Sequence, residues 1–236
     1  MRLPGFALAA LLALILSLGL DACQNVATYT QPTVVRVIDA SYKAPAINVN
    51  LDGSLFAANI CPGAITPYAI LPAKVGALIT VTPAAGGTPL ISANGSFLAG
   101  QQRSILLTDN GLTPTTYAVS FLDDRRTAAT TGQSEFRFIN QGLKAGPVDI
   151  YIVPDGVTLA NAIPVVTNLA PGLVSSCISF PSQSVNFIFT APSSTTAKYT
   201  SPAISLNGGE VRTTLIMDTK LTTNPPVTVF IGSGVN

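Results

Sequence analysis

Beyond residue 32, short runs of the chain alternate between apolar and polar residues. Val35 and Val37 alternate with Arg36 and Ile38, so in an extended strand the valines share one face. Clusters rich in Pro, Gly and Asn separate the runs, and no run has the period of an amphipathic helix. The pattern predicts strands at Thr33–Asp39, Ala46–Leu51, Ala64–Leu71, Ala77–Thr82, Pro89–Leu98, Arg103–Thr108, Thr116–Leu122, Glu135–Asn140, Val148–Val153, Gly172–Phe180, Val185–Thr190, Lys198–Leu206, Val211–Met217 and Val227–Ile231.

Many short strands joined by turns predict an all-β fold with two tandem antiparallel β-sandwich domains, immunoglobulin-like or transthyretin-like. We expect the domains at 33–124 and 134–236. A polar linker at 125–133 joins them, and a signal peptide at 1–22 and a tether at 23–32 precede them.

The expectation of two domains rests on a repeat. Residues 35–53 read VRVIDASYKAPAINVNLDG and residues 136–156 read FRFINQGLKAGPVDIYIVPDG. At an offset of 101, Arg36 aligns with Arg137 and Lys43 with Lys144. A constant offset of 109 then aligns the chain without gaps from Asn59 to Asp109, so the second copy carries extra residues within 153–167. A period near 100 residues is that of an independently folding domain.

The first residues predict export. Arg2 precedes an apolar stretch from Phe6 to Leu20, about the length of a signal-peptide core and too short for a comfortable membrane span. The segment Leu20-Asp21-Ala22-Cys23 is similar to a bacterial lipobox, although Asp21 replaces the usual small or hydroxyl residue. We therefore expect lipidation of Cys23, with plain secretion as the alternative. Gln24 favours the outer membrane, with the protein facing the periplasm or the cell surface.

Two further cysteines, Cys61 and Cys177, allow one disulfide in an oxidising compartment. The repeat aligns Cys61 with Ala170 and Cys177 with Tyr68, so a bond between the two cysteines would link the two domains. The alternative is a pair of free thiols, because cysteine packs well as a small apolar residue.

The repeated motif resembles a bacterial family known as domain of unknown function number 4397, often found in tandem behind a lipoprotein signal. Its pattern is roughly R-V-V-H-A-S-P-D-A-P-x-V-D-V-Y-V-D-G. Asp39 and Asn140 stand where the family usually has His. The resemblance implies an exported β-sandwich and no established activity. The matching residues here are Arg36, Val37, Ala40, Ser41, Ala44, Pro45, Val49, Asp52 and Gly53, and in the second copy Arg137, Phe138, Ala145, Asp149, Tyr151, Asp155 and Gly156.

The residues that are missing exclude several chemistries. The chain has no histidine, which removes His-based triads and His-based zinc sites. The net charge of +1 leaves no electrostatic footprint for nucleic acid. We predict no catalytic residues, no metal and no cofactor. Repeated Asp52-Gly53 and Asp155-Gly156 are hairpin signals, whereas Asp109 and Asp218 either cap a turn or pair with Arg103 and Arg212.

The recurring charged residues are the candidate ligand contacts. Arg36 and Arg137 lie within apolar strands, where a structural ion pair or hydrogen bond to a loop is one interpretation. The other is a ligand-facing site shared with Lys43 and Lys144 and suited to an acidic polymer, with tyrosines such as Tyr42 available to stack on sugars.

These features favour an exported, lipid-anchored envelope protein with a non-catalytic binding or structural role. Its partners would be the membrane, through the lipid, and an envelope protein or polysaccharide. The alternative is an envelope enzyme that acts on polysaccharide with a pair of carboxylates.

Overall fold

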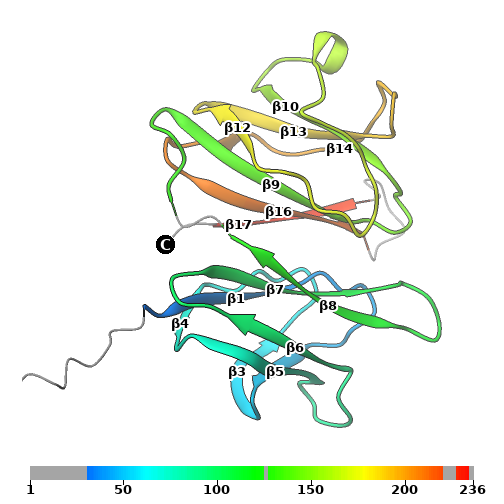
Figure 1. Cartoon of the computed structure of the whole chain (residues 1–236). Helices are drawn as coiled ribbons and strands as arrows, with labels where there is room; N and C mark the ends of the chain where they lie inside the picture. Colours follow the sequence, from blue (N-terminus) through cyan, green and yellow to red (C-terminus); the bar gives the residue numbers. More distant parts are fainter. Residues whose placement is uncertain (1–30, 125–126, 220–226, 234–236) are drawn as a thin grey trace, which may run out of the picture. The chain divides into compact units, whose positions relative to one another are not determined.

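The computed structural model describes residues 31–124, 127–219 and 227–233. Nearly all the regular structure there is β-strand, which confirms the predicted all-β fold (Figure 1). Residues 32–236 form one compact unit. The strands of its first sandwich are β1 (Thr33–Asp39), β2 (Ile47–Leu51), β3 (Ser54–Ile60), β4 (Ala69–Leu71), β5 (Lys74–Pro83), β6 (Ile91–Phe97), β7 (Gln102–Asp109) and β8 (Tyr117–Asp123).

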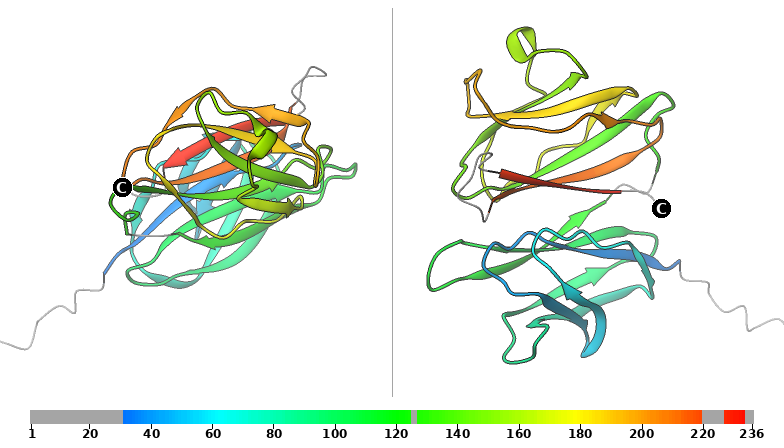
Figure 2. Two further views of the ribbon diagram at one scale, coloured as in Figure 1. Left: turned by 90° about the horizontal axis from the view of Figure 1, so that it is seen from above. Right: turned by 180° about the vertical axis from the view of Figure 1, so that it is seen from behind.

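The second sandwich repeats this set and adds a short 3₁₀ helix, η2 (Leu159–Asn161), which lies beyond β10 at the outer side of the sandwich (Figure 2). Its strands are β9 (Gln133–Gln141), β10 (Val148–Pro154), β11 (Val166–Leu169), β12 (Ile178–Pro181), β13 (Ser184–Thr190), β14 (Ala197–Thr200), β15 (Ile204–Ser205), β16 (Val211–Asp218) and β17 (Val227–Ser233).

The two sandwiches share one strand order. One sheet of each runs β4-β1-β7-β8 or β12-β9-β16-β17, and the other runs β3-β2-β5-β6 or β11-β10-β13-β14, with β15 also paired to β13. The pairing is mainly antiparallel, as predicted, with one parallel pair in each sandwich. Strands β1 and β7 pair in parallel, as do β9 and β16. The chain can return in parallel because it crosses through the opposite sheet between these strands.

Each sandwich has its own core between its two sheets. In the first, Val35 and Val37 of β1 pack with Ile79 and Val81 of β5. In the second, larger rings occupy the corresponding layer, and Phe136 meets Phe187 edge-to-face with centroids 5.2 Å apart. The period-2 alternation seen in the sequence therefore places the Val or Phe pair inward, as predicted.

A third apolar cluster lies on the opposite faces of β1, β7, β9 and β16, where the two sandwiches meet. Ile38 and Leu106 of the first sandwich pack there with Ile139 and Leu215 of the second. The backbones come close, since a Cβ added at Gly63 would lie 2.4 Å from the ring of Phe230. This buried apolar contact joins the two sandwiches through the sheet that contains β1 in the first and the sheet that contains β9 in the second.

The ungapped alignment of the two repeat copies is shifted by one residue from the structural equivalence of β5 and β13. Val49 pairs with Val81, and Ile150, which aligns with Val49, pairs with Phe189. A constant offset of 109 would instead align Val81 with Thr190. The first copy holds an extra residue where β5 shifts register against β6, beside Gly76 with a φ of +67°. A bulge of this kind adds a residue without reversing the inward face beyond it.

Both Asp-Gly pairs form tight turns, but only the first closes the expected hairpin. Asp52 and Gly53 have φ values of 50° and 82° and join β2 to β3, as in a two-residue hairpin. Gly156 also has a positive φ, of 80°, but the chain then enters the η2 segment before β11 begins. The edge strands β3 and β11 were missing from the predicted set.

Candidate functional site

Arg36 is buried, with 1% of its side chain exposed, and it reaches from β1 into the second sandwich. Its Nη2 donates to Oγ1 of Thr213 at 2.8 Å, and its Nη1 donates to the carbonyl of Ser233. Its Nε donates to Oγ of Ser104 at 2.7 Å within the first sandwich. A guanidinium whose donors are used in this way is a structural element of the interface between the sandwiches.

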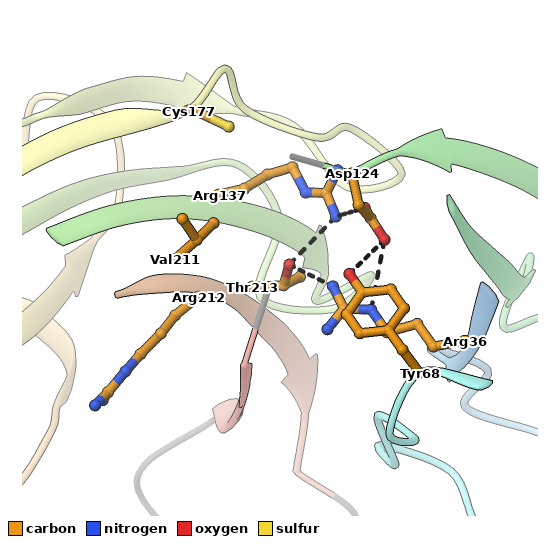
Figure 3. A pocket seen from close by; sticks show the side chains of 8 residues that line it. All are labelled: Arg36, Tyr68, Asp124, Arg137, Cys177, Val211, Arg212 and Thr213. Atoms are coloured by element: carbon orange, nitrogen blue, oxygen red, sulfur yellow. Dashed lines mark hydrogen bonds and ion pairs between the residues drawn. The ribbon is translucent and has the colours of Figure 1, made fainter. Parts of the chain in front are cut away.

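Asp124 supplies the negative charge for this cluster (Figure 3). Its side chain is 2% exposed, and its Oδ2 lies 3.6 Å from Nε of Arg36. The hydroxyls of Ser104 and Tyr68 both donate to the same Oδ2, the latter at 2.7 Å. Burial raises the pKa of Tyr68 above its ordinary value, so the phenol keeps its proton and remains a donor.

Arg137 makes the reciprocal crossing from β9. Its Nη2 contacts Oδ1 of Asp124 at 2.5 Å and Oγ1 of Thr213 at 3.2 Å, and its Nη1 donates to the carbonyl of Asp123 at 3.2 Å. Burial lowers the pKa of Arg36, and Arg137 lowers it further by repulsion, while Tyr68 and Asp124 act in the opposite direction. Two cations are thus held against one carboxylate.

The space beside this cluster is too small for an organic ligand. The cavity lined by Arg36, Asp124 and Arg137 has a volume of about 10 Å³, close to that of a single water-sized sphere. The expectation that Arg36 and Arg137 face a ligand together with the lysines is therefore wrong, and the structural ion pair is confirmed. The reason is that the face of β1 and β9 that carries the arginines is covered by the other sandwich.

Lys43 and Lys144 lie elsewhere and do come together. Both side chains are exposed, and both ammonium groups lie over the ring of Tyr42, with Nζ 5.7 Å and 5.4 Å from its centroid. Distances below about 6 Å permit cation–π attraction. Within the described residues neither ammonium forms an ion pair. Equivalent loops of the two sandwiches thus place two cations on one aromatic ring.

Buried carboxylates hold these two loops in position. Oδ2 of Asp109 accepts the backbone N–H of Lys43 at 2.5 Å, and Oδ2 of Asp218 accepts that of Lys144 at 2.8 Å. The interpretation of these aspartates as caps is confirmed, because Arg103 pairs instead with Asp123 and Arg212 with Glu210.

Asp39 and Asn140, at the family's usual His position, also brace the two loops. Oδ1 of Asp39 accepts the backbone N–H of Ser41, and Oδ1 of Asn140 accepts that of Gly142. Both side chains are buried, so these positions shape the loops that carry the lysines.

An open cleft of about 410 Å³ lies beside Tyr42. Cys61 and Pro62 line it from the first sandwich, and Met217 and Phe230 line it from the second. Its lining combines apolar side chains with a few polar ones, as is typical of small-molecule sites. The cleft is much larger than the cavity beside Arg36.

Cys61 and Cys177 are both free and exposed. The disulfide considered from the sequence is therefore not formed. The two thiols line different spaces, Cys61 the cleft beside Tyr42 and Cys177 the cavity beside Arg137.

The predicted signal peptide, Cys23 and most of the tether lie outside the described residues. In the described part of the chain, no helix is long and apolar enough to cross a membrane. Those same residues contain no group of three or more Cys, Asp or Glu side chains arranged to hold a metal ion.

Tyr68, Asp124 and Thr213 were not predicted as members of the arginine cluster. Asp124 was assigned to the end of the first domain and Thr213 to an ordinary strand position. A signal was available for Thr213, since the repeat aligns it with Ser104 and both hydroxyls accept hydrogen bonds from Arg36. No sequence signal showed that the two sandwiches meet through the faces of β1 and β9.

The fold defines an all-β protein built from two sandwiches. The family model described as domain of unknown function (DUF4397) matches residues 33–151, half of the chain. The chain belongs to this family. The match begins at β1 and ends within β10, so it includes the first sandwich and both copies of the Arg36 and Lys43 motif.

Other comparisons are distant. No curated protein matches the chain. Among solved structures, the Bacillus anthracis TIE protein is similar at 9% identity with a TM-score of 0.25. The alignment covers 86% of this chain and 44% of that protein, so the chain spans less than half of its length.

Proposed function

We propose that this protein is an exported, lipid-anchored bacterial envelope protein with a non-catalytic binding role. Its site is the cleft beside Tyr42, and its ligand is an acidic polysaccharide. The single observation that carries this proposal is the convergence of Lys43 and Lys144, one from each sandwich, on the ring of Tyr42.

The chemistry of the cleft supports a saccharide with acidic groups. Tyr42 and Phe230 offer aromatic surface to the apolar face of a sugar ring. The two exposed ammonium groups lie over the ring of Tyr42, which lines the cleft, and an ammonium group can pair with a carboxylate or a sulfate. Both cations are screened by salt, so they contribute selectivity and association rate as well as affinity.

The carboxylates support a non-catalytic role over the carboxylate-pair enzyme. Asp39, Asp109, Asp149 and Asp218 are all buried, and each accepts backbone N–H groups of a loop or strand end. These four carboxylates are therefore committed to holding the backbone of loops and strand ends. A glycosidase instead needs two carboxyl groups that face each other across the bound sugar.

The leader supports export and anchoring. Its apolar stretch ends at Leu20-Asp21-Ala22-Cys23, and lipidation of a cysteine there would attach several alkyl chains. One chain holds a protein to a membrane only marginally, whereas two or more hold it stably.

We also propose that residues 134–236 are a second copy of the family domain. The shared strand order supports this. Equivalent hydrogen bonds support it too: the backbone N–H of Val37 donates to the hydroxyl of Thr66, and the backbone N–H of Phe138 donates to the hydroxyl of Ser175.

Cosedimentation with insoluble acidic and neutral polysaccharides tests the proposed ligand. The chain should bind the acidic matrix and be released by salt, and Lys43→Gln with Lys144→Gln should release most of it. Lys74→Gln is a matched control, since Lys74 is exposed but pairs with Asp52 away from the cleft. Equal retention of all three proteins on both matrices would contradict the proposal.

Fractionation of cells tests the anchor separately. The full-length chain should be recovered with membranes, and Cys23→Ala should move it to the soluble exported fraction. Retention of the Cys23→Ala variant in the membrane would contradict lipidation and leave the proposed ligand unaffected.

A further inference from the structure

Gln141 is the last residue of β9, and it links the loop that carries Lys144 to the first sandwich. The residue is 2% exposed, and its Nε2 donates to the backbone carbonyl of Asp109 at 2.9 Å. Its own carbonyl accepts the backbone N–H of Leu143 at 3.0 Å, at the start of the loop that carries Lys144. The hydrogen bond to Asp109 therefore joins the second loop to the residue that holds the first.

Asp109 holds the loop of the first sandwich with both of its carboxylate oxygens. Oδ2 accepts the backbone N–H of Lys43, and Oδ1 accepts that of Gly111 at 2.9 Å. Leu143 packs on the same turn, since a Cβ added at Gly111 would lie 2.5 Å from Cδ1 of Leu143. One hydrogen bond and one apolar contact thus fix the loop that carries Lys144 relative to the loop that carries Lys43.

The repeat shows that stability does not require a polar side chain at this position. The equivalent residue of the first sandwich is Ala40, which is buried in the apolar cluster between the sandwiches. Gln141 instead buries an amide, and Oε1 of that amide has no hydrogen-bond partner among the described residues. A buried acceptor without a partner costs free energy. The hydrogen bond that the amide does make, across to Asp109, therefore indicates a role in placing the two loops.

We propose that Gln141 is a positioning residue of the site at Tyr42, and that it makes this site select oligosaccharides with closely spaced acidic groups. The inference rests on the proposed function. The ammonium groups of Lys43 and Lys144 lie 5.7 Å and 5.4 Å from one ring centroid, so both can pair with one ligand while the loops keep this spacing. A ligand with two acidic groups gains from both cations, because its second pairing is intramolecular, whereas a ligand with one acidic group gains from one. Gln141 sets the spacing without touching the ligand.

Gln141→Met in the full chain tests this role, because methionine has a similar size and cannot donate to Asp109. Calorimetric titration with oligogalacturonate, which has a carboxylate on every sugar, should show an increase in Kd of about fivefold. The Kd for monomeric galacturonate, followed by NMR, should not change. Asn186→Leu is the matched control, since the amide of Asn186 donates to the carbonyl of Ser201 within the second sandwich. It should leave both Kd values unchanged.

A double-mutant cycle separates positioning from a general loss of structure. The Lys144→Gln protein keeps only one of the two cations, so adding Gln141→Met should not raise its Kd for oligogalacturonate further. If Gln141→Met does not fold, Leu143→Ala decides, because it removes the contact with Gly111, leaves the hydrogen bonds of Asp109 in place and should give the same selective loss. An unchanged Kd, an equal loss for both ligands or additive effects in the cycle would overturn the role of Gln141 and leave the proposed function intact. Failure of the unaltered chain to bind oligogalacturonate would contradict the proposed function, and this inference with it.

Discussion

Arg36 on β1 and Arg137 on β9 occupy the same position in the two sandwiches, and each side chain crosses into the other sandwich. Arg36 donates to Thr213 and to the carbonyl of Ser233, whereas Arg137 pairs with Asp124 and donates to the carbonyl of Asp123. The exchange stabilises this contact, because it supplies acceptors to two guanidinium groups that the contact removes from water.

The shared carboxylate should be the most sensitive position of this interface. Asp124→Asn leaves both guanidinium groups buried without a counter-charge, and loss of one partner from a buried ion pair costs about 3–5 kcal/mol. Chemical denaturation should show a decrease of that size in the free energy of unfolding. Asp123→Asn is the control, because the side chain of Asp123 is 73% exposed and exposed ion pairs contribute at most about 1 kcal/mol. Equal effects of the two substitutions would contradict the described network.

The close approach of the two sandwiches makes Gly63 sensitive to a single added methyl group. A Cβ there would lie 2.4 Å from the Phe230 ring, whereas a Cβ at Gly53 meets nothing within 4 Å. The φ values, +88° and +82°, are similar, so backbone strain cancels in the comparison. Gly63→Ala should destabilise the protein by about 1–3 kcal/mol more than Gly53→Ala in thermal or denaturant unfolding. Similar losses would mean that Phe230 does not pack there.

Tyr68 should make stability depend on pH in the alkaline range. Burial raises its pKa in the folded state above the ordinary value of about 10, so above pH 10 the unfolded chain loses this proton first. Its contribution is fully present below pH 10 and decreases as pH rises, by up to about 1.4 kcal/mol per pH unit. Denaturation from pH 8 to 11.5 should show a steeper decline for the unaltered protein than for Tyr68→Phe. Parallel curves would contradict the assignment.

The free thiols should react in the folded protein. Cys61 and Cys177 are exposed, so a maleimide should modify both under native, non-reducing conditions, and peptide mass spectrometry should identify each site. Cys61→Ser and Cys177→Ser should each change the free energy of unfolding by less than about 0.5 kcal/mol, because surface substitutions seldom cost more. A linked pair of peptides containing both residues would show that the bridge does form.

The alternation of apolar and polar residues was sufficient to predict most strands and their inward faces. Val35, Val37, Phe136 and Phe138 are buried as the period-2 pattern requires. Edge strand β3 was not predicted, because its residues are largely exposed and Asn59 within it has a positive φ of 52°. The parallel pairing of β1 with β7 was also not predicted. Strand order depends on how the chain crosses between the sheets, and the local pattern of apolar and polar residues carries no information about that crossing.

The candidate residues divided in a way that the repeat could not reveal. Because Arg36 and Arg137 occupy equivalent positions in the repeat, as do Lys43 and Lys144, the sequence suggested that all four act together. Whether the strand face that carries a residue is open to solvent depends on the contact between the sandwiches. That contact buries Arg36, leaves 11% of the Arg137 side chain exposed, and brings Lys43 and Lys144 to one ring. Tyr42 was recognised as a residue that can stack on sugars, while its position between the two lysines follows only from the three-dimensional arrangement.

The central claim is that loops from both sandwiches build one anionic-ligand site at Tyr42, and titration of a short acidic oligosaccharide into the full chain tests it most directly. We predict one ligand per chain and an increase in Kd of about fivefold for Lys43→Gln and for Lys144→Gln, equivalent to about 1 kcal/mol each, with Lys74→Gln unchanged. A stoichiometry of two, or a Kd that either substitution at Lys43 or Lys144 leaves unchanged, would contradict a site shared by the two sandwiches.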